Sequence, residues 1–264
     1  MESKVVEYYT NTFNEHFRHL DAFGKIQQLR TLQLLQKHLL GKQKIIDIGG
    51  ATGIYSFELA KLGHEVDLFD IAPIHIKKAK KISAETGVDL HGFHIGDAQH
   101  LAFSDNSFDA VILHGPLYHI TDESLRLRVL KEAYRVMKPE GILFAFAINR
   151  YAGVFYGIQR ELILNDPYFE MISNEVKTGF RERSPSWHFH LPQEMEAEVS
   201  KSGFRDIQMK GVVGPIWMLP DIESRLGDEQ TRQKILRVSE LLENEPIIGQ
   251  DFVCIARKTN VSTP

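Results

Sequence analysis

The sequence contains a single cysteine, Cys254, among 264 residues. One cysteine can form neither a disulfide within the chain nor a cysteine-based metal site. Such sparing use is typical of a reducing compartment, so we expect a cytoplasmic protein. Long apolar runs are also missing, since no stretch approaches the roughly 18 residues of a membrane span. The opening segment, residues 1–13, is polar and charged throughout and lacks the apolar core of a signal peptide.

Neither sign of charge dominates the chain. Its 31 lysine and arginine residues are interspersed with 35 aspartate and glutamate residues, for a net charge of −4. A nucleic-acid-binding protein is expected to gather basic residues on one face. The basic run between Lys77 and Lys81 falls within a predicted helix and is interpreted as a solvated face. We therefore expect no nucleic-acid partner and no membrane partner, and the oligomeric state is left open.

Apolar residues make up 43% of the chain and follow an alternating pattern that indicates an α/β domain. A mostly parallel sheet covered on both faces results from such alternation, with ligands binding at the carboxyl ends of its strands. We predict a Rossmann-like, seven-stranded sheet with helices on both faces, an N-terminal helical segment and an insertion after strand five. The predicted strands are 44–48, 65–69, 93–95, 108–113, 142–148, 204–213 and 247–257, and the predicted helices are 25–40, 54–62, 73–85, 121–138, 191–203 and 221–243.

A glycine-rich turn, Asp47–Gly53, joins the first predicted strand to the following helix. Glycines allow unusual backbone angles, and the free N–H groups of a helix N-terminus attract anionic ligand groups. A dinucleotide-binding turn would read G-x-G-x-x-G, but Ala51 and Ile54 occupy its third and sixth positions counted from Gly49. This spacing disfavours a nicotinamide oxidoreductase. Asp70, at the end of the second strand, can accept hydrogen bonds from ribose hydroxyls.

Together, several motifs in order resemble class I S-adenosylmethionine-dependent methyltransferases, and among them small-molecule enzymes of the UbiE-like, type 11 kind. The turn at Asp47 resembles D-x-G-x-G-x-G, with Ala51 in place of the middle glycine. The resemblance covers residues 44–148 well and 191–257 weakly. Its remaining motifs are Asp70–Pro73, Gly96–Ala98 with Ser107–Val111, His114–Ile120 and Glu132–Gly141.

The resemblance implies that S-adenosylmethionine is the cofactor, with S-adenosylhomocysteine as product, and that a small molecule accepts the methyl group. It places Asp47 near the methionine end of the cofactor, Asp70 at the ribose, and Asp97 and Ala98 at the adenine, and it counts Ile71 among the cofactor-binding residues. The other implied cofactor-binding residues are the turn glycines, the strand-four histidine, an arginine that would pair with the carboxylate and a tyrosine over the site: Gly49, Gly50, Gly53, His114, Arg30 and Tyr9.

A general base is needed only if the acceptor must lose a proton. The candidates are His114, Tyr118 and His119, at the mouth of the fourth strand. The alternatives are that His119 only packs against the next helix, that His114 contributes only its backbone, and that Arg30 is a surface charge. His188 and His190 could join His114 or His119 around a metal, but no acid–histidine pattern supports this, so we expect no metal.

The resemblance also divides the chain into a cofactor-binding part and a substrate-binding part. We expect an N-terminal cap at 1–43, a cofactor-binding half at 44–148, a substrate-side insertion at 149–190, a C-terminal part at 191–258 and a tail at 259–264. The sequence after strand four reads His114–Leu117 in place of the N/D-P-P-Y/F run of many base-N-methylating enzymes. The alternative function is a binding module of the same fold that holds the cofactor or a partner without transferring a methyl group.

Overall fold

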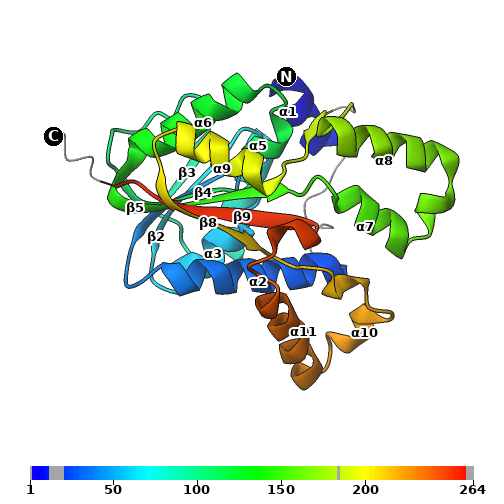
Figure 1. Cartoon of the computed structure of the whole chain (residues 1–264). Coiled ribbons are helices and arrows are strands. Elements are labelled where there is room, and N and C mark those ends of the chain that lie inside the picture. Colours follow the sequence, from blue (N-terminus) through cyan, green and yellow to red (C-terminus); the bar gives the residue numbers. More distant parts are fainter. Residues whose placement is uncertain (1, 12–20, 183–184, 260–264) are drawn as a thin grey trace.

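A seven-stranded sheet forms the centre of the protein in the computed structural model, which describes residues 2–11, 21–182 and 185–259 (Figure 1). The strand order is β3-β2-β1-β4-β5-β9-β8, and only β9 runs antiparallel to its neighbours. This confirms the predicted fold class. The strands are β1 (Lys44–Ile48), β2 (Glu65–Asp70), β3 (Gly92–Ile95), β4 (Phe108–Leu113), β5 (Met137–Ile148), β8 (Arg205–Gly211) and β9 (Asp251–Arg257).

Helices cover both faces of this sheet, with α6 and α9 on one face and α2 and α3 on the other (Figure 1). None of the helices in the described ranges is long and apolar enough to cross a membrane. The helices are α1 (Glu2–Asn11), α2 (Ala22–His38), α3 (Ile54–Lys61), α4 (Pro73–Thr86), α5 (Pro116–His119), α6 (Glu123–Val136), α7 (Ala152–Gln159), α8 (Asp166–Thr178), α9 (Pro192–Lys201), α10 (Ile222–Arg225) and α11 (Glu229–Leu241).

The core has two layers because alternate residues of each central strand point to opposite faces of the sheet. Along β1, Ile45 packs into the layer under α2, α3 and α4, while Ile46 and Ile48 pack into the layer under α6 and α9. All three side chains are at most 1% exposed. A strand buried on both faces reads as a continuous apolar run, which is why this one could be predicted from sequence.

Two predicted helices begin or continue differently in the structure. Thr121 was the expected cap of the helix over 121–138, but Asp122 caps α6 by accepting from the backbone N–H of Ser124 at 2.7 Å. The single helix predicted over 221–243 is wrong. The chain leaves helical geometry between α10 and α11, and Asp228 starts α11 by accepting from the N–H of Thr231 at 2.8 Å. A short aspartate side chain favours such a cap over continuation of the preceding helix.

The insertion after β5 is tied to the sheet at both of its ends. Asn149 donates its side-chain amide to the carbonyls of Ile247 and Gly249 at 2.7 and 2.8 Å. The backbone N–H of His190 donates to the carbonyl of Ile148 at 2.9 Å, which returns the chain to the point where it left. Between these ends, α7 and α8 project beyond the edge of the sheet (Figure 1), and β6 (Phe180–Arg181) pairs with β7 (Trp187–His188).

A buried ion pair joins the first and last thirds of the chain. Arg30 on α2 is 3% exposed and donates to Glu243, just after α11, at 3.0 Å. Lys37, whose side chain is 54% exposed, donates to the other oxygen of Glu243 at 2.9 Å. Arg30 also donates to Gln33 at 2.7 Å, so the charged end of this arginine is held within the fold.

These two cations on one carboxylate provide a matched stability test. Arg30→Ala should lower the free energy of unfolding by about 2–3 kcal/mol, because a buried carboxylate loses its buried hydrogen-bonded partner and keeps the solvent-exposed Lys37 and the more distant Lys210, at 3.8 Å. Lys37→Ala should cost at most about 1 kcal/mol, as expected for an exposed pair. Urea denaturation followed by circular dichroism measures both. Equal losses for the two variants would show that the burial of Arg30 contributes nothing.

Candidate functional site

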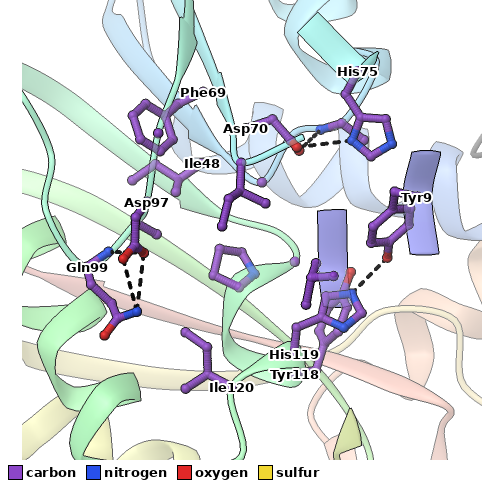
Figure 2. A pocket seen from close by; sticks show the side chains of 18 of the residues that line it. Tyr9, Ile48, Phe69, Asp70, His75, Asp97, Gln99, Tyr118, His119 and Ile120 are labelled. Carbon is purple, nitrogen blue, oxygen red and sulfur yellow. Dashed lines mark hydrogen bonds and ion pairs between the residues drawn. The ribbon is translucent and has the colours of Figure 1, made fainter. Parts of the chain in front are cut away.

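A cavity lies at the carboxyl ends of β1, β2 and β4, where the strand order reverses and ligands of such sheets bind (Figure 2). Of the residues singled out in the sequence, eight line it, namely Tyr9, Gly49, Asp70, Ile71, Asp97, Ala98, Tyr118 and His119. The rest of the wall consists of Val5, Ile48, Ala51, Phe69, His75, Gly96, Gln99, Gly115, Pro116, Ile120 and Leu125.

The glycine turn forms one wall because it lies against the segment that follows β4. Gly49 has a φ of +77°, and a Cβ added there would stand 2.6 Å from Cδ of Pro116. Gly115 has a φ of +151°, and its Cβ would stand 3.2 Å from the carbonyl oxygen of Gly49. Ala51 also has a positive φ, of 51°, in the position where the resembling motif has glycine. The turn thus requires small residues at these positions.

Asp70 holds the glycine turn, the start of α4 and a histidine through its carboxylate (Figure 2). Its Oδ2 accepts from the N–H of Ala51 at 2.9 Å, and its Oδ1 accepts from the N–H of Ala72 at 2.8 Å. His75 Nδ1 lies 3.1 Å from the same Oδ1. An ionised carboxylate has about four acceptor positions, so these three contacts leave one position, and Asp70 lines the cavity.

Two polar side chains of the cavity were missed by the sequence analysis. His75, on the first turn of α4, is 3% exposed, and its Nε2 has no hydrogen-bond partner among the described residues. Gln99 donates through its side-chain amide to Asp97 Oδ2 at 3.1 Å, and its backbone N–H donates to Oδ1 at 2.9 Å (Figure 2). The signal for His75 was its place two residues after Pro73, one turn into a helix that starts beside Asp70.

Asp47 lies beneath the glycine turn and does not line the cavity. It is fully buried, its Oδ2 accepts from Ser56 Oγ at 2.6 Å, and its Oδ1 has no hydrogen-bond partner in the described part of the chain. A Cβ at Gly50 would stand 2.5 Å from Oδ2, so this glycine makes room for the carboxylate. Burial, supported by the nearby Asp70 charge and opposed by Ser56, raises the pKa of Asp47 to about 6.

Helix α1 covers the cavity through two side chains, Val5 and Tyr9. Tyr9 points toward His119, and its hydroxyl lies 2.8 Å from Nε2 of that histidine (Figure 2). Three residues that line the first cavity, Ile71, Gly96 and Asp97, also border a second cavity of about 610 Å³ on the opposite side of α1. This helix therefore separates two spaces that share one wall.

Gly50 and Gly53, like Asp47, are outside the lining of the cavity, and two further expected site residues lie elsewhere. Arg30 was expected at the cofactor or on the surface, but it is buried against Glu243 and does not line the cavity. His114 was a candidate base, but its ring stacks between Tyr55 and Phe146, with centroids at 5.1 and 4.4 Å, on the α3 side of the sheet. Only its backbone approaches the turn, since its carbonyl oxygen would lie 3.2 Å from a Cβ added at Gly49. Strand alternation turns this side chain away from the site.

A larger cavity of about 730 Å³ lies between the insertion and the end of β5. Tyr156, Tyr168, Trp187 and Phe189 supply aromatic walls, and Arg181 supplies a positive charge that is paired with Glu175. Trp187 stacks on Tyr118 with ring centroids 5.7 Å apart and planes 1° apart. Since Tyr118 lines the first cavity, this stack is where the two cavities meet.

Comparison with known proteins places this geometry in a family. A family model described as a methyltransferase domain matches residues 40–196, more than half of the chain. A ubiquinone biosynthesis O-methyltransferase of Azorhizobium caulinodans is 28% identical over 172 residues, which are 64% of this chain and 62% of that protein. The chain spans about half to two thirds of the length of the curated relatives it matches first.

Solved structures share the fold at low sequence identity. A methyltransferase from Thermotoga maritima, described as a possible histamine N-methyltransferase, has a TM-score of 0.58 at 20% identity and covers 98% of this chain and all of its own. The [4+2]-cyclase SpnF has a TM-score of 0.56 at 16% identity, covering 87% of this chain and 81% of its own. The fold thus accommodates different reactions, and the reaction must be argued from the site.

The raised pKa of Asp47 predicts how stability depends on pH. The folded pKa, about 6, lies above the ordinary 3.8, so the folded state gains stability from this group below about pH 4 and loses it as pH rises through 6. Asp47→Asn removes that loss. The variant should gain about 2–3 kcal/mol relative to the natural protein between pH 4 and pH 7, measured by urea denaturation without ligand. A difference that stays constant over this range would contradict the assignment.

Proposed function

The chain belongs to the methyltransferase-domain family, and from this premise we propose that it transfers a methyl group from S-adenosylmethionine to a small-molecule acceptor. The observation that carries the proposal is Asp70, which faces the cavity with one acceptor position left while it holds the glycine turn beside it. A carboxylate in this place suits a ribose hydroxyl, and Asp97 on the same wall suits the adenine amino group.

The glycine turn supports this cofactor over a dinucleotide. Positive-φ glycines bring main chain, with no side chains between, to the edge of the cavity at Gly49 in the turn and at Gly115 in the segment after β4. Asp47, directly below the turn, has an unpartnered buried oxygen and a raised pKa, so a cation that binds above it would be stabilised by the ionised form. The methionine part of S-adenosylmethionine carries such a cation in its amino group.

Cofactor entry requires movement of α1. The free space in the cavity is about 110 Å³, well below the roughly 300–1,000 Å³ of ligand pockets. The second cavity beyond α1 shares Ile71, Gly96 and Asp97 with the first, so displacing the helix joins the two spaces. The hydrogen bond of Tyr9 to His119 is the contact that such a movement breaks.

We propose that the acceptor binds on the insertion side, in the aromatic cavity next to Trp187. The bound cofactor supplies an electrophilic methyl group, and the protein's contribution is to align the acceptor and exclude water. His119 lines the first cavity and packs against Trp187 with ring centroids 4.6 Å apart, so it lies between the two spaces. It is placed to remove a proton from a hydroxyl or amine, whereas His114 is not. Tyr118 lies beside it and shapes the same boundary.

The ribose assignment is tested by calorimetric titration with S-adenosylmethionine and S-adenosylhomocysteine. Asp70→Ala should weaken binding by about 1–3 kcal/mol, or about 5- to 150-fold, because charge-assisted hydrogen bonds are lost. Arg30→Ala, which removes a charge outside the cavity, serves as the matched control and should leave affinity unchanged within about threefold. NADH should not bind. Unchanged affinity in Asp70→Ala, or NADH binding alone, would overturn the assignment.

The base assignment is tested by offering the enzyme a panel of phenols, catechols and amines as acceptors. The S-adenosylhomocysteine formed with each is measured by mass spectrometry. With an acceptor so identified, His119→Ala should lower kcat by about 100-fold or more while the Kd for the cofactor changes little. Tyr9→Phe keeps the ring and removes only the hydroxyl contact, so it controls for packing. Cofactor binding without turnover of any acceptor would favour the binding-module alternative.

A further inference from the structure

A cluster of two histidines and a glutamate lies at the end of the insertion, outside the cavities described above. His188 is in β7, His190 follows two residues later, and Glu198 lies on α9. One potential ligand atom from each side chain lies within 4.8 Å of the other two. The rings of His188 and His190 are 4.2 Å apart between centroids and perpendicular, at 89°.

The imidazoles in this cluster lack the partners that buried polar groups normally have. His190 is 0% exposed, and neither of its ring nitrogens has a hydrogen-bond partner among the described residues. Its Nε2 is 3.5 Å from Glu198 Oε2, beyond a good hydrogen bond. Nε2 of His188 is likewise buried and unpartnered within the part of the chain that the structure describes. Three buried nitrogens without a partner in one place call for an explanation, because a buried polar group that nothing binds destabilises the fold.

Arg126 fixes the carboxylate without using all of its acceptor positions. Its Nε donates to both oxygens of Glu198 at 3.1 Å, and its Nη2 donates to Oε1 at 2.6 Å. Oε2 therefore carries a single contact with Arg126 and still has a lone pair on the His190 side. Hydrogen bonds of this kind orient metal-binding carboxylates in proteins.

We propose that His188, His190 and Glu198 supply three ligands to one divalent transition-metal ion, such as Zn²⁺, and leave its fourth position to a water molecule. Imidazole and carboxylate groups suit Zn²⁺, Co²⁺ and Ni²⁺, and a zinc ion would draw the ligand atoms to about 2.0–2.2 Å from itself. The expectation of no metal rested on histidines near His114 or His119 and on a missing acid. The missing acid is Glu198, which α9 places beside the two histidines. His114 is not part of the cluster, because its ring lies between Tyr55 and Phe146.

The proposed ion would attach the end of the insertion to α9. Its first ligand, His188, directly follows Trp187, which stacks on Tyr118 of the cofactor cavity. A bound metal would thereby fix the strand that carries the boundary between the two cavities. This inference is independent of the methyl transfer proposed above.

The test uses the full chain, purified without a histidine tag or chelator. Metal content by inductively coupled plasma mass spectrometry should be about one Zn²⁺ per chain, and Co²⁺ added to the metal-free protein should give a visible d–d absorption band that saturates at about one equivalent. Zn²⁺ should also raise the unfolding midpoint of the metal-free protein. Absence of both the zinc and the cobalt band would overturn the proposal.

Variants locate the site. His188→Ala, at a half-buried position, should abolish the cobalt band and the zinc-dependent shift in unfolding midpoint, while circular dichroism confirms that it folds. His91→Ala removes a histidine that also contacts an aspartate, Asp67, at 2.9 Å but lies outside the cluster, and it should keep both signals. Equal binding by the natural protein and His188→Ala would show that the metal binds elsewhere and would overturn the proposal.

Discussion

The close approach of two backbone segments, the turn after β1 and the segment after β4, is the constraint on which the site depends. Gly49 and Pro116 are so near that a single added Cβ would stand 2.6 Å from the proline ring. This contact places Ile48, Gly49, Gly115 and Pro116 on one wall and aims α5 toward the cavity. Asp70 then holds the turn from the other side through the N–H of Ala51. These two contacts position the wall of the cavity that the glycine turn and the segment after β4 form.

The sequence predicts this framework well because it is encoded locally. Buried parallel strands appear as short apolar runs, and the turns that must adopt positive φ require glycine, so both leave a mark in consecutive residues. The strand boundaries at Phe108–Leu113 and the acid at the end of β2 follow from such marks. Ala51 departs from this rule, because it has a positive φ although it is not glycine. The division between α10 and α11 was missed because an aspartate cap competes with an otherwise helical pattern.

The parts that could not be predicted depend on contacts between distant residues. Arg30 pairs with Glu243, 213 positions later in the chain, and no local sequence pattern at either residue predicts the pair. His114 stands at the expected place in the chain, but the direction of its side chain is decided by alternation at a strand end, where one residue more or less reverses the face. His75 enters the cavity because α4 begins beside Asp70, which is a fact of packing. The same is true of Glu198 beside His190.

The stack of Trp187 on Tyr118 connects these local and distant contributions. Tyr118 belongs to the segment after β4 that the glycine turn positions, whereas Trp187 belongs to an insertion held by Asn149 and His190 at the end of β5. Because Trp187 stacks on Tyr118, a shift of the insertion changes the packing of a side chain in the cavity wall. His119, in contact with Trp187, Tyr118 and Tyr9, lies where the insertion, the segment after β4 and α1 meet. Any movement of α1 or of the insertion therefore acts on one side chain, His119.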